Sequence, residues 1–260
     1  MPAINLIDAH CHLDFDAFEH DRSAVLQRAV ENNISDIVIP GTKKKYWERI
    51  RILCANNTPG RPKLHACYGL HPYWTNEHSK NDTEALAQYI ANNRPVAIGE
   101  CGLDFRPQQA DKKSQVYFFE KQLAIAVNSQ LPVVIHSVKA TETVIQVIKK
   151  FDGLSGMVHS YSGSVEQAKQ LIELNFFISI GGSVTYENAK SIRKVAREIP
   201  LHSLLIETDA PDQPGLKNRG QRNEPAYLVN TLEAISSLRE EPPQIIARQT
   251  ASNTRSLFDI

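Results

Sequence analysis

The sequence predicts an α/β protein whose eight parallel strands alternate with helices in a closed (β/α)8 barrel, the TIM-barrel fold. Two observations predict it. Eight short runs rich in Val, Ile and Leu recur along the 260 residues, and stretches with helical spacing lie between them. Nearly continuous apolar strands suit this barrel because helices cover its outside and side chains fill its inside.

The predicted strands are apolar runs of four to seven residues, and the β-branched residues in them favour a pleated surface. In chain order they are INLID (4–8), DIVIP (36–40), KLHACYG (63–69), PVAIG (95–99), PVVIH (132–136), GMVH (156–159), FFISIG (176–181) and SLLIET (203–208). We expect these runs to form the barrel wall.

The predicted helices carry apolar residues three and four positions apart. They include residues 21–33, 114–129, 164–175 and 187–199, and two closing helices cover 224–238 and 242–258. Residues 209–220, DAPDQPGLKNRG, read as a long loop because they are rich in proline and glycine. We expect a single domain over residues 1–260.

An open doubly wound sheet is the alternative fold. It would place a glycine-rich phosphate loop after an early strand, but neither GxGxxG nor GxxxxGKS/T is present. Lys plus Arg and Asp plus Glu number 29 each, so there is no overall basic field to attract nucleic acid.

The composition also bears on location. Four cysteines without paired spacing, and an N-terminus without a signal-peptide pattern, predict a reduced, cytoplasmic protein. No apolar run approaches the roughly 20 residues that cross a bilayer. Nothing in the pattern indicates an obligate protein partner.

Residues of metal-ligand type end the predicted strands, where the active sites of such barrels lie. They are His10, His12, Glu100, His136, His159 and Asp209. Strand alternation puts His10 and His12 on one face with Cα atoms roughly 6.5 Å apart, so both rings can reach one ion. Because six such side chains at one mouth are costly to bury without cations, we predict a metal site.

Several neighbouring residues allow more than one interpretation. Asp8 shares the face of the two histidines and is placed to hold one ring by its second nitrogen, whereas Cys11 points away and packs. Asp104 either caps the loop after the fourth strand or contacts substrate. His71 is ambiguous. The other histidines read as structural or solvated, namely His20, His65, His78 and His202.

Eight motifs run in order along essentially the whole chain. They are DAHCHLDF from Asp8, YGLHP from Tyr68, GECGLDF from Gly99, LPVVIHS from Leu131, HSYSGS from His159, LLIETDAP from Leu204, RGQRNEP from Arg219 and ASNTRSLF from Ala251. With them the chain resembles the TatD-type metal-dependent hydrolases and deoxyribonucleases, a branch of the amidohydrolase-like barrels.

This resemblance implies a centre with two divalent cations. The first ion would be held by His10, His12 and Asp209, the second by His136 and His159, with Glu100 between them. A mixed nitrogen and oxygen set accepts Zn, Mn, Co or Ni, and Mg less naturally because Mg prefers oxygen.

The chain departs from the family pattern at two places. Val138 stands where the family commonly has an arginine after the histidine and serine, and Lys139 is the nearest replacement. Ser160 and Tyr161 stand where the family often has cysteine and phenylalanine. Neither departure touches a predicted ligand, so both bear on the substrate.

Two cations suit phosphodiester hydrolysis because they activate a water and clamp the attacking and leaving oxygens. We expect Asp209 to ligate the first ion and to take the proton from the water. Glu207 is the competing base, since it shares a strand face with Asp209.

Basic residues around the predicted mouth are candidate phosphate contacts. They are Arg106, Lys139, Arg219 and Arg222. The alternative for RGQRNEP is structural, with Arg222 and Glu224 paired locally and Pro225 opening the following helix.

The sequence thus favours a nuclease that acts on single-stranded DNA or on DNA ends. The neutral charge, and the absence of a basic stripe interleaved with aromatic residues, count against it. The alternative is a hydrolase of a small amide, ester or phosphoester, because fold does not fix substrate. Structural metals are a third reading, but structural sites usually close with thiolates, and this set is rich in carboxylates.

Overall fold

The computed structural model describes residues 5–56 and 58–260, and its eight parallel strands pair in chain order. The strands are β1 (Leu6–Asp8), β2 (Ile34–Ile39), β3 (Lys63–Tyr68), β4 (Ala97–Asp104), β5 (Val133–Val138), β6 (Gly156–Val158), β7 (Phe176–Ile180) and β8 (Leu204–Ile206). Ile4, the first residue of the first predicted strand, lies outside the described residues.

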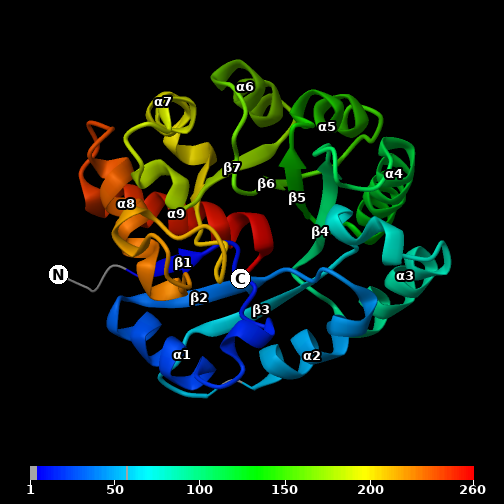
Figure 1. Cartoon of the computed structure of the whole chain (residues 1–260), viewed down its shortest axis with the longest axis horizontal. Helices are drawn as coiled ribbons and strands as arrows, with labels where there is room; N and C mark the ends of the chain where they lie inside the picture. The colour runs from blue at the N-terminus through cyan, green and yellow to red at the C-terminus, as the bar shows by residue number, and fades with distance from the viewer. Residues whose placement is uncertain (1–4, 57) are drawn as a thin grey trace.

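Backbone hydrogen bonds join the two ends of the strand order. Ala9 N donates to Ile206 O at 3.1 Å, and His12 N donates to the carbonyl of Ala210 at 2.8 Å. Figure 1 shows the strands as a ring with helices around it. The predicted (β/α)8 barrel is therefore confirmed.

Helices α1 to α8 each follow the strand of the same number, and α9 packs on β1 and β8. The α-helices are α1 (Arg22–Glu31), α2 (Lys44–Ala55), α3 (Asn81–Asn93), α4 (Lys112–Ser129), α5 (Thr141–Ile148), α6 (Val165–Glu173), α7 (Lys190–Glu198), α8 (Leu228–Ser236) and α9 (Pro243–Phe258). Short 3-10 helices are η1 (Asp16–Phe18), η2 (Pro72–Glu77), η3 (Gly182–Thr185), η4 (Leu201–Ser203), η5 (Leu216–Asn218) and η6 (Pro225–Tyr227).

Some elements begin or end at residues other than the predicted ones, because strand pairing and side-chain capping set their limits. β4 continues past the predicted end at residue 99, because its later residues pair with β5 as far as Asp104 and Val138. The helix predicted over 224–238 begins as η6 and becomes α8, and the loop predicted over 209–220 contains η5. Ser164 and Gln167 cap α6 reciprocally, which is why that helix begins at Val165.

The barrel interior holds a compact apolar layer on the amino-terminal side of the polar residues. Seven buried residues and the partly buried Phe177 supply it from the strands or the residue after them, namely Ala9, Val38, Cys67, Ala97, Val134, Met157 and Leu205. Leu257 and Phe258 at the end of α9 pack against this layer. Apolar side chains therefore fill the interior on this side of the polar residues.

On three of these strands, a polar side chain of the site follows two residues after the apolar one. Residues two apart share a strand face, so His136 follows Val134, His159 follows Met157 and Glu207 follows Leu205 toward the carboxyl ends. Among the helices of the described residues, none combines the length and the apolarity that crossing a bilayer requires.

Candidate metal centre

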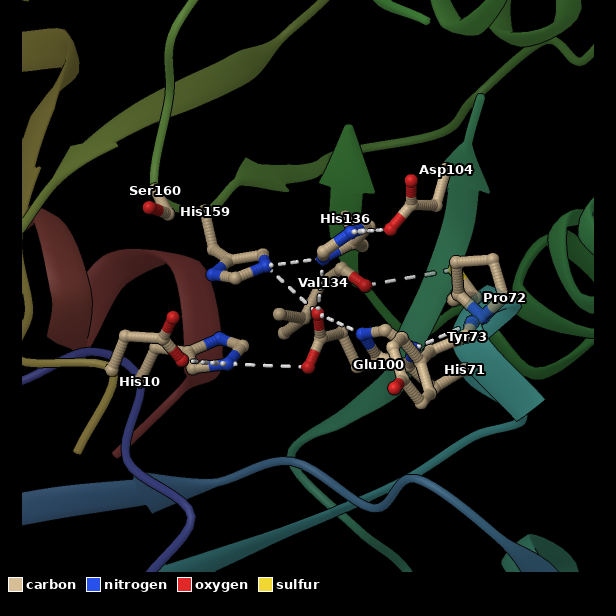
Figure 2. A network of polar contacts seen from close by, with 12 residues as sticks. His10, His71, Pro72, Tyr73, Glu100, Asp104, Val134, His136, His159 and Ser160 are labelled. Carbon is tan, nitrogen blue, oxygen red and sulfur yellow. Dashed lines mark hydrogen bonds and ion pairs between the residues drawn. The ribbon is translucent and has the colours of Figure 1, made fainter. Parts of the chain in front are cut away.

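Glu100 lies at the middle of a cluster of buried histidines (Figure 2). Its Oε1 is 2.9 Å from His71 Nε2, 2.9 Å from His136 Nδ1 and 2.7 Å from His159 Nε2. Its Oε2 faces the other way and is 3.3 Å from His10 Nε2 and 3.3 Å from His12 Nε2. One carboxylate therefore contacts two sets of histidines, one with each oxygen.

The first set comes from the ends of β1 and β8. His10 Nε2 and His12 Nε2 are 3.3 Å apart, so the two rings lie together as expected, although both residues follow the last residue of β1. Asp209 Oδ1 is 3.4 Å from His10 Nε2 and 3.7 Å from His12 Nε2. The three ligand atoms lie within 4.8 Å of one another, close enough to share one cation.

The second set comes from β5 and β6. His136 Nδ1 is 3.1 Å from His159 Nε2, and each ring has a carboxylate at its other nitrogen. Asp104 Oδ2 is 3.4 Å from His136 Nε2, and Glu207 Oε1 is 3.5 Å from His159 Nδ1. Outer carboxylates of this kind fix the orientation and tautomer of metal-binding histidines.

His71 is the residue that the sequence left ambiguous. Its Nδ1 accepts a hydrogen bond from the backbone N–H of Tyr73 at 2.9 Å, so this nitrogen carries no proton. Burial lowers the pKa of His71 to about 3, which keeps the ring neutral and leaves its single proton on Nε2. Nε2 then donates to Glu100, so His71 orients the central carboxylate.

The buried charges act strongly on one another. Burial opposes a charge on Glu100, but its contacts with His71, His159 and His10 outweigh burial and hold its pKa well below the ordinary value. Burial also opposes a proton on His12, yet Glu100 and Asp209 raise its pKa to about 9. In the absence of a cation, protons on the imidazoles therefore balance the carboxylates.

The donor atoms fit divalent cations. Glu100 Oε2 is buried and accepts no hydrogen bond from the described residues, although two ring nitrogens lie near it. Facing imidazole nitrogens can share a single proton at most, whereas a cation accepts both lone pairs. Histidine and carboxylate ligands from five strands, or from the residues just after them, converge here without any thiolate, a set typical of catalytic rather than structural sites.

Asp209 is held by a contact that the sequence did not indicate. Its Oδ2 accepts a hydrogen bond from the side-chain amide of Gln213, and Gln213 Oε1 accepts one from Ser160 Oγ at 2.8 Å. Ser160 is one of the two departures from the family pattern. Since it lies 53 positions before Gln213, only the folded chain shows this link.

Glu207 and Asp8 are buried carboxylates with other partners. Glu207 accepts hydrogen bonds from Ser160 N at 2.6 Å and from Ser179 Oγ at 2.5 Å, so both oxygens are engaged. Asp8 accepts from the backbone N–H and the hydroxyl of Thr208 and from the backbone of His10. The expectation that Asp8 holds a histidine ring is wrong, because Thr208 occupies both of its oxygens.

The candidate phosphate contacts lie in different settings. Asp104 binds the Arg106 guanidinium, whose side chain is 37% exposed, so Arg106 reaches the surface beside His136. Lys139 follows β5 directly and is exposed. Arg219 lies on the surface after η5. As substrate contacts, all of them remain predictions.

The guanidinium of Arg222 bonds to Asp21 and to the carbonyl of Ala17, and it lies 4.7 Å from the centroid of Phe18. These contacts support the structural interpretation of RGQRNEP, although the partner is Asp21 and Glu224 is more distant, at 3.9 Å. Glu224 instead pairs with Arg28. A role of Arg222 in substrate binding also remains a prediction.

The other histidines and Cys11 have structural contacts or face solvent. His65 Nε2 is 2.8 Å from Asp36 Oδ1 across β2 and β3, and His78 Nε2 is 2.9 Å from the carbonyl of His71. His20 and His202 are exposed. Cys11 is buried in the apolar core, as expected.

Comparison with known proteins agrees with this geometry. A family model described as TatD related DNase matches residues 7–259. The chain belongs to the TatD family. It is 37% identical over 258 residues to YjjV of Escherichia coli K12, described as an uncharacterized metal-dependent hydrolase, with 98% of both chains covered.

Solved structures of this family have the same fold. The crystal structure of E. coli YjjV, a TatD homologue, matches with a TM-score of 0.92 and 35% identity over 99% of both chains. A TatD-family hydrolase from Entamoeba histolytica matches with a TM-score of 0.85 and 25% identity over 98% of both chains. The chain is therefore a metal-dependent hydrolase of the TatD family.

Proposed function

We propose that this TatD-family hydrolase is a deoxyribonuclease that cleaves phosphodiester bonds of single-stranded DNA or of DNA ends with two divalent cations. The position of Glu100 carries the proposal, since its two oxygens face two separate sets of histidines. The description of the family as TatD related DNase supports the choice of DNA.

The proposal assigns the ligands by the oxygen of Glu100 that they face. The first cation would be held by His10, His12 and Asp209, the second by His136 and His159, and Glu100 would contact both. Four imidazoles with two carboxylates favour Zn, Mn, Co or Ni over Mg. His71 would hold Glu100 in place by donating a hydrogen bond from its Nε2–H to that carboxylate.

When bound, the cations lower the pKa of a water and offset the charge that develops on the phosphoryl oxygens. Asp209 would accept a proton at Oδ2, the oxygen that faces Gln213, while its Oδ1 faces His10 and His12. Because Gln213 is exposed, its amide can exchange with water without moving buried groups. The contact with Ser160 returns Gln213 to Asp209.

Glu207 supports this chemistry by position. Its carboxylate keeps the His159 ring oriented through Nδ1 and holds the backbone of Ser160. The role of proton carrier, which the sequence left open for Glu207, is the weaker assignment because Ser160 and Ser179 already engage both of its oxygens. Arg106 and Lys139 are the proposed phosphate contacts at the rim.

A small phosphoester is the second candidate substrate, and the formal net charge of zero favours it. One preparation loaded with metal separates the two. We expect labelled single-stranded DNA to be cleaved with a higher kcat/KM than a small phosphodiester, and each to inhibit the other competitively. Cleavage of the small substrate alone would transfer the proposal to that substrate class.

The four cysteines are free thiols, as they would be in a reducing compartment. We place the enzyme in the cytoplasm as part of the proposal. Fractionation of the native host, with the protein followed by antibody, tests this placement.

A further inference from the structure

A pocket lined by aromatic side chains lies beside the metal centre. Its volume is about 250 Å³. We call it the aromatic pocket and define it by Phe15, Tyr46 and Trp74 together with Asp14, Asp16 and Arg49. These residues come from the segment after β1, from α2 and from η2, and the three aromatic side chains are partly exposed.

Two ring contacts connect the aromatic pocket to the metal centre. The Phe15 ring stacks on His12, with centroids 4.6 Å apart and planes inclined by 18°. The Trp74 ring meets His71 edge to face at 5.2 Å. His12 and His71 both contact Glu100, so a group in the pocket lies one ring away from the reacting atoms.

Cationic side chains surround the same rings. The Lys43 ammonium lies 4.7 Å from the centroid of Trp74 and 5.4 Å from that of Tyr46. Arg49 pairs with Asp16, whose side chain is 79% exposed, so an incoming phosphate can compete for this guanidinium. Base stacking on aromatic rings beside cations is how proteins hold single strands of nucleic acid.

Asp14 lines the inner wall of the aromatic pocket. Asp14 is buried, and its Oδ1 has no hydrogen-bond partner among the described residues. A buried acceptor without a donor is uncommon and marks a position where a donor is expected.

We infer that the aromatic pocket binds the base of a nucleotide next to the phosphodiester bond that the metal centre cleaves. This inference rests on the proposed function and names a part of its substrate. It also explains why the sequence shows no basic stripe interleaved with aromatic residues. The rings and cations of the pocket come from separate segments, which only the folded chain brings together.

Nucleotide binding can be measured without cleavage. Trp74 is partly exposed and Trp47 is buried, so a nucleotide in the pocket is expected to quench the fluorescence of Trp74. Deoxycytidine monophosphate would be titrated into the metal-loaded protein, its Tyr46→Leu variant and a Phe177→Leu variant. Tyr46 does not contact the metal centre, and Phe177 is a partly buried ring at the other end of the barrel.

We expect Tyr46→Leu to raise the Kd of the nucleotide about tenfold, as the loss of one stacking ring does, and Phe177→Leu to leave it unchanged. Trp74→Leu should abolish the signal and so identify its source. Equal Kd values for the nucleotide in wild type and Tyr46→Leu would overturn the inference. So would the absence of quenching in the wild type.

Cleavage gives a second readout. Single-stranded oligonucleotides would each lack one base, at successive positions. In the wild type, removal of one base beside the cleaved bond should raise KM about tenfold, and in Tyr46→Leu the same removal should change KM by less than about twofold. An equal penalty in both proteins would overturn the inference.

The two proposals can fail separately. If the metal-loaded wild type binds the nucleotide through Tyr46 but cleaves no oligonucleotide, the proposed function fails and the pocket stands. If it cleaves DNA and Tyr46→Leu changes neither Kd nor the penalty for a missing base, the pocket fails and the proposed function stands.

Discussion

Side chains that would not bind the proposed cations still fix the orientation of the ligand side chains. His71 donates to Glu100, Asp104 contacts His136 and Glu207 contacts His159. Asp104 and Glu207 contact the ring nitrogens that a cation would not use, whereas His71 donates to Oε1 of Glu100, the oxygen that also faces His136 and His159. The geometry of the centre therefore depends on a ring of outer partners as much as on the ligands.

Replacing Glu207 by glutamine keeps its shape but removes the charge that orients His159. We expect kcat to fall 10- to 100-fold or metal affinity to fall by a similar factor, as is usual for outer partners of metal-binding histidines. Steady-state kinetics and metal analysis of the purified variant measure both. Ser179→Ala removes a neutral donor to the same carboxylate and serves as the matched control, with a smaller effect.

Normal kcat and normal metal content in Glu207→Gln would show that the charge of Glu207 has no role in the site. A loss of kcat together with a shifted pH dependence, at normal metal content, would instead favour Glu207 as the base and displace Asp209 from that role.

Sequence reasoning found residues whose position follows from strand alternation. His10 and His12 are of this kind, since two residues separated by one position on a strand must share a face. His71 could not be placed because it follows β3 in a segment where Pro72 begins a 3-10 helix, and the direction of that turn depends on tertiary contacts. The same holds for Gln213, whose partners lie on other loops.

Among the elements, β4 and β5 make the closest approach that the site requires. Gly102 on β4 has φ of +129°, and a Cβ at this position would lie 2.1 Å from the carbonyl oxygen of His136. Only glycine combines this conformation with this contact. The approach sets His136 beside Glu100, since both follow from the pairing of the two strands.

Gly102→Ala should therefore lower the free energy of unfolding by roughly 3 kcal/mol or more, because the new methyl group must displace backbone. Urea unfolding followed by circular dichroism measures the change. Gly153→Ala is the matched control, since Gly153 has φ of +79° with nothing within 4 Å of the added Cβ. It should cost about 1 kcal/mol, and equal costs at the two positions would contradict the clash.

β2 and β3 are joined by a polar pair that gives a pH dependence. Burial opposes the charge on Asp36, but hydrogen bonds from His65 and Ser35 outweigh it and lower the pKa of this carboxyl. A lowered pKa in the folded state means that the ionised Asp36 carboxylate stabilises the protein above the pKa of the unfolded chain, about 3.9. This stabilisation is lost as the pH falls toward the folded value.

Asp36→Asn should cost about 1 kcal/mol near pH 7, and the difference from wild type should shrink as the pH falls from about 5 to about 3. Urea unfolding at several pH values measures it. A cost that stays constant over this range would show that the charge of Asp36 contributes nothing.

The positions and the order of the strands could be predicted from the sequence, because parallel barrel strands are nearly continuous apolar runs. The start of α8 was less readable, since Pro225 and Tyr227 form a 3-10 turn before it. The path of β4 beyond residue 99 depends on its pairing with β5, which no local pattern contains.

For the whole molecule, the barrel brings charged and polar groups into one buried cluster that only cations satisfy fully. The apolar layer capped by Leu257 and Phe258 closes the opposite end. Stability and metal binding are thus linked, because an unfolded chain does not present the ligands together.

Metal removal should lower the melting temperature of the whole chain. A cation at about one hundred times its Kd adds about 2.7 kcal/mol, which corresponds to roughly 5 °C or more for a protein of this size. Calorimetry before and after chelation measures the shift, with Glu100→Ala as the variant that should lose most of it. We also expect one transition, as for a single domain, and two separate transitions would contradict that prediction.

Cleavage of 3′-labelled single-stranded DNA by protein stripped of metal and reloaded with Mn, Mg or Zn tests whether the Glu100 cluster is a two-cation nuclease centre. We predict no cleavage by the stripped protein, restored cleavage after reloading with at least one of these metals, and none by reloaded Glu100→Ala. Intact DNA after full reloading of the wild type, or equal cleavage by Glu100→Ala, would contradict this proposal.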